Sequence, residues 1–218
     1  LQQVSCLIDR WGGGISQAIG TGGRDLNAQV GGSTMIACLD ALAADENTNV
    51  IVLISKPPSP EAADKVLGKA ATVNKPVIVS FLGNTMGGPL AGKLVKAKDL
   101  ETAAHAAVRL TGIDVAAPER HLLTADEVEG LSTQLSGTQR YVRGLYSGGT
   151  FSYEAILLLT ETLGPIHSTT PLVPEFKLDD PWQSLAHTVL DLGDDLFTRG
   201  RPHPMIDHRL RNDRIIQE

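Results

Sequence analysis

The sequence predicts an α/β protein built on an open, doubly wound parallel sheet. Residues 50–54 and 77–81 are two continuous apolar runs rich in β-branched side chains, a pattern typical of strands covered on both faces. Residues 61–71 lie between them and carry apolar side chains at helical spacing. A strand, a helix and a second strand in this order make a βαβ unit, in which the strands are parallel and the crossover is right-handed.

Further elements belong to a first domain that we expect to span residues 1–116. Helical spacing of apolar side chains recurs in three more segments, residues 1–10, 33–44 and 99–110. Two short apolar segments are expected to be strands, residues 15–19 and 113–116.

A second, related α/β unit is expected at residues 141–218, after a linker at residues 117–140. Its predicted elements alternate in the same way: strand 141–145, helix 153–163, strand 188–192 and helix 209–218. The linker contains Thr124 and, three residues later, Glu127. This capping-box pattern predicts a short helix within the linker.

The two units show a weak internal repeat of strand, glycine loop and helix. Residues 15–19 and Met35-Ile36 correspond to residues 188–192 and Met205-Ile206. Each copy lacks part of a complete sheet, and a sheet of two strands is not stable alone. We therefore expect the chain to be truncated or incomplete.

Composition narrows the class of protein. The formal net charge of −6 argues against nucleic acid or an anionic membrane surface as a partner. The longest apolar runs are far too short to span a bilayer. Cys6 and Cys38 are too few for a disulfide framework, and we interpret them as buried free thiols of a cytoplasmic protein.

Two glycine loops are candidate anion sites. Gly22, Gly23 and Arg24 follow the strand expected at residues 15–19, and glycines there let the backbone present N–H groups to an anion. Arg24 could add a bidentate contact to phosphate or carboxylate. The alternative is a tight turn with a solvated Arg24–Asp25 pair.

The second loop has a more specific context because it stands between a predicted strand and a predicted helix. Its residues are Ser147, Gly148, Gly149 and Thr150. The start of a helix offers unpaired N–H groups and a positive dipole to an anion. Simple capping of the helix by the two hydroxyls is the alternative. Neither loop has the spacing of a dinucleotide fingerprint or the lysine of a P-loop.

A third polar cluster follows the last predicted strand. Asp194 is expected to orient a polar group, and Arg199 and Arg201 form a positive patch with His203. A loop of mutually compensating charges is the alternative. The sequence has no zinc-ligand spacing and no hydrolase elbow, so we assign no metal ligand and no catalytic residue.

Three stretches of the sequence resemble the FdrA proteins: residues 9–26, 139–150 and 193–207. The resemblance covers nearly the whole chain. FdrA proteins are similar to the α subunit of succinyl-CoA synthetase, whose ligase domain is flavodoxin-like. The resemblance therefore implies two succinyl-CoA-synthetase-like ligase units with flavodoxin-like sheets.

The resemblance also implies group-transfer chemistry with other subunits of the same enzyme. Some FdrA proteins are a subunit of oxamate carbamoyltransferase, which converts carbamoyl phosphate and oxamate to oxalurate and phosphate. The alternative is an acyl-CoA synthetase that uses CoA and a nucleotide with Mg²⁺. That reaction passes through a histidine in a Gly-His-Ala-Gly setting, and the corresponding stretch from Gly83 to Gly92 has no histidine. A non-catalytic scaffolding subunit and a homo-oligomer are further possibilities.

Overall fold

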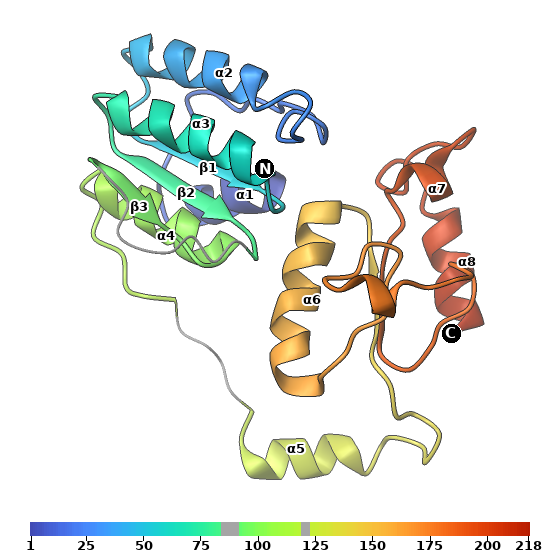
Figure 1. Cartoon of the computed structure of the whole chain (residues 1–218). Helices are drawn as coiled ribbons and strands as arrows, with labels where there is room; N and C mark the ends of the chain where they lie inside the picture. The colour runs from blue at the N-terminus through green and yellow to red at the C-terminus, as the bar shows by residue number, and fades with distance from the viewer. Residues whose placement is uncertain (84–91, 119–122) are drawn as a thin grey trace. The chain divides into compact units, whose positions relative to one another are not determined.

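The structure, a computed structural model, describes residues 1–83, 92–118 and 123–218. The chain divides into two compact units, Leu1–Glu119 and Arg120–Glu218, which we call unit 1 and unit 2 and describe separately. Each unit contains a parallel sheet, and the strands of unit 1 can be followed in Figure 1. The predicted α/β class with parallel sheets is confirmed.

Unit 1 is built on a three-stranded parallel sheet in the order β1-β2-β3. β1 (Ile51–Ser55) and β2 (Val77–Phe81) are the two predicted apolar strands, and Ile51 pairs with Val77. The helix α3 (Pro60–Thr72) connects them. α3 begins where the sequence indicates, because Ser59 caps it and Pro60 occupies its first position.

Helices cover both faces of this sheet. The helix α2 (Ser33–Ala44) packs with α3 on one face, and α1 (Gln2–Arg10) packs with α4 (Leu100–Leu110) on the other (Figure 1). Successive side chains of β2 point to opposite faces of the sheet. Val77, Val79 and Phe81 pack in the core with α2 and α3, whereas Ile78 is buried on the other face. The predicted helices of unit 1 are confirmed.

Two predicted strands of unit 1 are wrong. Residues 15–19 and 113–116 belong to no strand. Ile15 and Ile19 are each 43% exposed. Packing against a neighbouring layer therefore does not stabilise a strand there. The third strand is instead β3 (Leu94–Lys96), which the sequence analysis missed because it is short and flanked by lysines.

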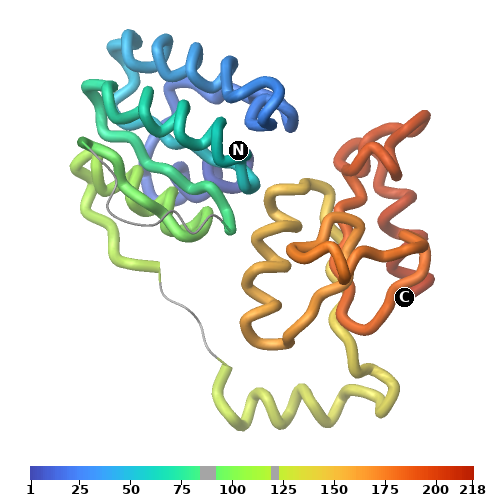
Figure 2. Tube along the Cα trace, in the orientation of Figure 1, coloured from blue at the N-terminus to red at the C-terminus, as the bar shows by residue number. Residues whose placement is uncertain are grey.

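Unit 2 has a two-stranded parallel sheet of β4 (Arg143–Tyr146) and β5 (Thr188–Asp191). The helix α6 (Gly149–Leu163) connects them and buries Ile156 against Val189 on one face. The short helix α7 (Asp195–Thr198) and the C-terminal helix α8 (Arg209–Gln217) lie on the other side (Figures 1 and 2). A short 3₁₀ helix, η1 (Pro174–Phe176), stands between α6 and β5.

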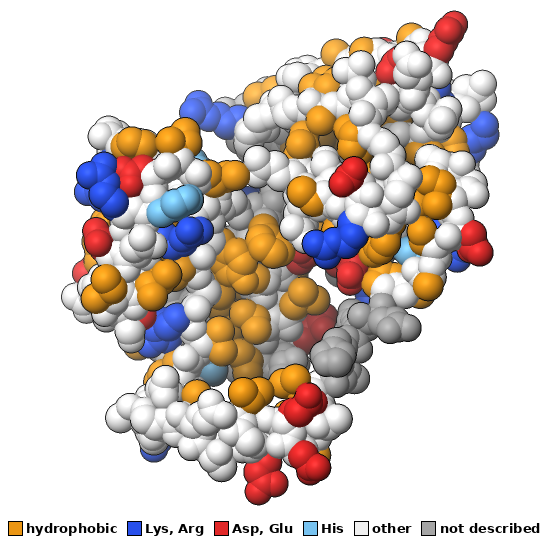
Figure 3. All heavy atoms as spheres, turned by 180° about the vertical axis from the view of Figure 1, so that it is seen from behind, with side chains coloured by type: hydrophobic (Ala, Val, Ile, Leu, Met, Phe, Trp, Pro, Cys, Tyr) orange, Lys and Arg blue, Asp and Glu red, His pale blue; other side chains and the backbone are white. Residues whose placement is uncertain are grey.

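The helix α5 (Ala125–Ser132) occupies the expected linker. Thr124 accepts a hydrogen bond from the Glu127 N–H, and the Glu127 carboxylate accepts bonds from Thr124, so the predicted capping box is confirmed. α5 buries none of its residues, and acidic side chains stand out on this segment at the bottom of Figure 3. The proposed boundaries of the linker stay a prediction.

The internal repeat and the environment of the thiols differ from expectation. Residues 15–19 are not a strand, whereas their counterparts at residues 188–192 form β5 and the residue after it. Met205-Ile206 lie in a turn, whereas their counterparts Met35-Ile36 lie in α2. Cys6 is exposed and Cys38 is half-buried, so the interpretation of two buried thiols is wrong. Within the described residues, no helix combines the length and the apolar character needed to cross a membrane.

Candidate functional site

The second glycine loop and the third polar cluster meet at the carboxyl edge of the unit 2 sheet. The last residues of the two strands, Tyr146 and Asp191, lie opposite each other. The pairing continues one residue further, because the Leu192 N–H donates to the Tyr146 carbonyl at 2.8 Å. The loops after both strands therefore share one edge, where open α/β sheets bind their ligands.

The helix α6 presents an open N-terminus at this edge. Its N-cap is Gly148 and its first residue is Gly149, so the helix starts earlier than predicted and includes Thr150. The N-cap glycine supplies no side-chain hydrogen bond to the first N–H groups of α6, and the first turn of the helix contains no acidic residue. The first N–H groups and the positive end of the helix dipole are therefore not capped by a side chain of the N-cap residue.

Two buried hydroxyls lie in the same stretch of chain. The Oγ atoms of Ser147 and Ser152 are buried and have no hydrogen-bond partner among the described residues. Ser152 is fully buried, and side chains of a helix lean toward its N-terminus. A buried hydroxyl without a partner costs free energy. The structure thus does not support the alternative in which the Ser147 hydroxyl merely caps α6.

Aromatic and acidic groups border the open N-terminus. The Tyr146 and Phe151 rings pack edge to face, with their centroids 5.2 Å apart. Burial raises the pKa of the Tyr146 phenol, and the negative charge of Glu154 raises it further. Tyr146 therefore remains a neutral hydroxyl at physiological pH.

The third polar cluster is divided by the structure. The Asp194 carboxylate caps α7 by accepting the Leu196 N–H at 2.9 Å. Arg199 and Arg201 are both exposed. The Arg201 guanidinium lies 6.0 Å from the centre of the Trp182 ring. In the described parts of the chain, no group of three or more His, Cys, Asp and Glu side chains is arranged to hold a metal ion.

His203, which the sequence analysis grouped with these arginines, belongs to the sheet edge instead. A β-carbon placed on Gly193 would lie 2.7 Å from His203 Nε2 and 3.1 Å from both Asp191 Oδ1 and the Ser147 carbonyl oxygen. Sequence reasoning did not find this convergence. The position of Gly193 just after a buried strand was the one local signal. His203 comes close to it only in the folded chain, and the sequence does not indicate that contact.

The first glycine loop has a different character. Gly22, Gly23 and Arg24 are exposed. The neighbouring Asp25 is 3% exposed, and its carboxylate accepts the Thr34 and Met35 N–H groups at 2.9 Å each. The chain thus supplies its own anion to the N-terminus of α2. Anion binding by this loop stays a prediction, and the structure gives it no open helix end.

We expect Asp25→Ala to lower the free energy of unfolding of unit 1 by about 2 kcal/mol, because the N–H groups of Thr34 and Met35 lose their acceptor and the second of these bonds is buried. Asp40→Ala is the matched control: Asp40 lies on α2 and pairs with Lys69 but is 61% exposed, so its loss should cost about 0.5 kcal/mol or less. Urea unfolding followed by Trp11 fluorescence in a Trp182→Phe background would measure both. Equal effects of the two substitutions would contradict the capping role.

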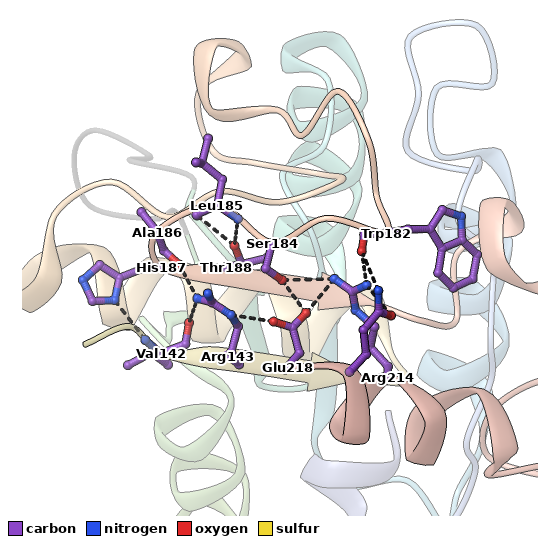
Figure 4. A network of polar contacts seen from close by, with 11 residues as sticks. Val142, Arg143, Trp182, Ser184, Leu185, Ala186, His187, Thr188, Arg214 and Glu218 are labelled. Carbon is purple, nitrogen blue, oxygen red and sulfur yellow. Dashed lines mark hydrogen bonds and ion pairs between the residues drawn. The ribbon is translucent and has the colours of Figure 1, made fainter. Parts of the chain in front are cut away.

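A polar network holds the opposite, amino edge of the unit 2 sheet (Figure 4). The Glu218 carboxylate lies between Arg143 of β4, whose Nε donates at 2.7 Å, and Arg214 of α8, whose Nη2 lies 2.6 Å away. Arg214 is 2% exposed and also donates to the Trp182 carbonyl and, at 3.0 Å, to the Ser184 hydroxyl. The network fixes α8 to the strands.

The polar contacts of two other histidines, His187 and His105, stabilise the fold. His187 Nδ1 accepts the Val142 N–H at 3.2 Å beside the network. His105, half-buried on α4, has its Nε2 3.1 Å from the Ala116 carbonyl oxygen and packs edge to face on Trp11. The stretch in which the resemblance would place a phosphorylated histidine lies largely outside the described residues.

Comparison with known protein families gives a match in unit 2. Residues 145–218 match the CoA-ligase family model. Unit 2 thus contains a CoA-ligase-like segment, of the type found in succinyl-CoA synthetase, and this segment includes the open N-terminus of α6, Gly193 and His203.

A relative from Escherichia coli (strain K12), named "Uncharacterized protein YahF", is 42% identical over 217 residues. The alignment covers 100% of this chain and 42% of that protein. The chain thus spans less than half the length of this relative.

Proposed function

We propose that the chain is the phosphate-binding part of a group-transfer enzyme of the CoA-ligase type. In this proposal the open N-terminus of α6 holds the phosphate of an acyl phosphate. The observation that carries it is the uncapped start of α6 beside the buried, unpartnered Ser147 hydroxyl. Helix N-termini bind phosphate well because unpaired N–H groups and the dipole act together.

The proposed contacts come from the backbone and from hydroxyls. The N–H groups of Gly149 and Thr150 would donate to phosphate oxygens, with Gly148 giving the backbone room to approach. The Ser147 hydroxyl would donate as well. Such donors, fixed before the reaction, stabilise the charge that develops on phosphate as the acyl–oxygen bond breaks. Arg199 and Arg201, which are exposed, would attract anions to the site from solution.

At family level the match supports acyl-CoA synthetase-like chemistry, with CoA and a nucleotide as cofactors. Our finer proposal is carbamoyl transfer by an FdrA-type subunit. The carbamoyl carbon would form a C–N bond with the oxamate nitrogen while its C–O bond to phosphate breaks, and the proton of that nitrogen would leave with phosphate. The absence of histidine between Gly83 and Gly92 favours this version, because carbamoyl phosphate arrives already activated.

Calorimetric titration of the whole chain with inorganic phosphate tests the proposal. We expect saturable binding, with chloride at equal ionic strength giving none. A chain that binds neither phosphate nor an acyl phosphate would contradict the proposal and favour a scaffolding role.

Assays on the complex that co-purifies with the protein distinguish the two proposed reactions. Phosphate release that requires both carbamoyl phosphate and oxamate supports carbamoyl transfer. Nucleotide turnover that requires CoA, without that activity, supports acyl-CoA synthesis.

A further inference from the structure

The helix α5 carries an apolar stripe that the described residues of its unit leave uncovered. Val128 and Leu131 lie three residues apart in α5, and Leu135 continues the stripe in the turn that follows the helix. Each of these three side chains is more than half exposed. Apolar and acidic side chains both gather on this segment at the bottom of Figure 3. The stripe is therefore a surface available to a partner.

A helix as short as α5 requires such a cover. It has eight residues, and Gly130 lies inside it. Isolated helices shorter than about 12–15 residues are marginal in water, and an internal glycine weakens a helix further. The capping box of Thr124 and Glu127 stabilises only its first turn. We therefore expect contacts along the stripe to keep α5 folded.

Charge decides which kind of surface can cover the stripe. Residues 123–139 contain three acidic residues, Asp126, Glu127 and Glu129, and no Lys or Arg. Two α5 helices packed against each other would therefore bring like charges together, which is unfavourable. The stripe fits an exposed apolar surface that is surrounded by cations.

Unit 2 itself contains a surface of this kind. The segment 199–211, which we call the basic segment, runs from the end of α7 into the first turn of α8. It contains four arginines and one acidic residue, which gives a net charge of +3 against −3 for α5. Met205 is half exposed in this segment, and Ile206 is 81% exposed. Since α5 and the basic segment are both exposed, neither covers the other within one chain.

We propose that α5 of one copy of this chain docks on the basic segment of a second copy. The second copy docks its own α5 on the first in return, which gives a closed dimer with two identical contacts. In each contact the stripe packs on Met205 and Ile206, while the acidic side chains beside it attract the arginines. The proposal does not rest on the phosphate site at the start of α6.

Sedimentation equilibrium of the whole chain over a range of concentrations tests this contact. The unmodified chain should approach twice its monomer mass as the concentration rises. Leu131→Asp puts a charge into the apolar contact, so it should raise the dissociation constant of the dimer at least about tenfold. Thr133→Asp is the matched control, because it adds the same charge on the opposite side of the helix and should have little effect.

Reversal of charge distinguishes this contact from any other self-association. Asp126→Lys with Glu129→Lys makes α5 positive, and Arg209→Glu with Arg211→Glu makes the basic segment negative. Each of these two variants alone should be a monomer, because its contacts bring like charges together. A one-to-one mixture should form the dimer again, since both contacts then join opposite charges. Recovery on mixing also shows that the variants are folded.

Three results would each overturn the proposal. The first is an unmodified chain that stays a monomer at every concentration. The second is a dimer that Leu131→Asp leaves intact. The third is a failure of the two charge-reversed variants to pair on mixing although their circular dichroism matches that of the unmodified chain.

Discussion

Replacing Arg214 with Met should lower the free energy of unfolding of unit 2 by about 3 kcal/mol. Arg214 is 2% exposed, and its loss leaves the largely buried Glu218 carboxylate with Arg143 as its remaining cationic partner. It also removes a donor from the Trp182 carbonyl and the Ser184 hydroxyl. Removing one partner of a buried ion pair costs about 3–5 kcal/mol.

Urea unfolding followed by Trp182 fluorescence in a Trp11→Phe background measures this change. Arg209→Met is the matched control, because Arg209 also lies on α8 and also pairs with a carboxylate, Asp207, but is 84% exposed. The control should change stability far less. Similar losses in the two variants would show that burial of the network does not govern the stability of unit 2.

The same network predicts a loss of stability in acid. Burial disfavours the charge on Glu218, but hydrogen bonds from Ser184 and Arg143 and the charge of Arg214 outweigh it, so its pKa lies below the usual 4.5. A lowered pKa in the folded state adds stability at pH values above 4.5, and this contribution disappears as the pH falls through the folded-state value. Glu218→Gln should reduce that part of the pH dependence.

Replacing Ser147 with Asp should weaken phosphate binding at least about tenfold. The added carboxylate would stand beside the open start of α6 and repel a phosphate there. Unit 1 shows the same arrangement in its natural form, since the Asp25 carboxylate occupies the start of α2.

Ser147→Asn is the matched control for this variant, since it has the same shape as the aspartate without its charge. Calorimetry with inorganic phosphate should show a loss of binding for Ser147→Asp that is much larger than the loss for Ser147→Asn. Equal affinities of the two variants would place the phosphate away from the start of α6.

Much of the fold could be predicted because parallel strands covered on both faces read as unbroken apolar runs. β1 and β2 are such strands, and α3 between them begins at a Ser-Pro signal. The edge strand β3 could not be found in this way, because its three residues are half-exposed or exposed. The strand predicted at residues 15–19 is wrong because apolar side chains alone do not make a strand. No neighbouring element buries Ile15 or Ile19, which are both exposed.

The candidate site was predictable only where it depends on neighbours in the chain. Ser147 to Thr150 follow a strand and begin a helix, and this local pattern indicated the open start of α6. The convergence of His203 on Gly193 joins segments from different parts of unit 2. The Asp25 cap on α2 likewise bridges a turn of the chain. No local periodicity encodes such contacts.

The central claim, that the start of α6 binds phosphate, is tested most directly by amide NMR spectroscopy during a phosphate titration. The account predicts that the amide signals of Gly149, Thr150 and Phe151 shift together along one binding curve. Shifts confined to Gly22, Gly23 and Arg24, with the amides of α6 unmoved, would contradict it.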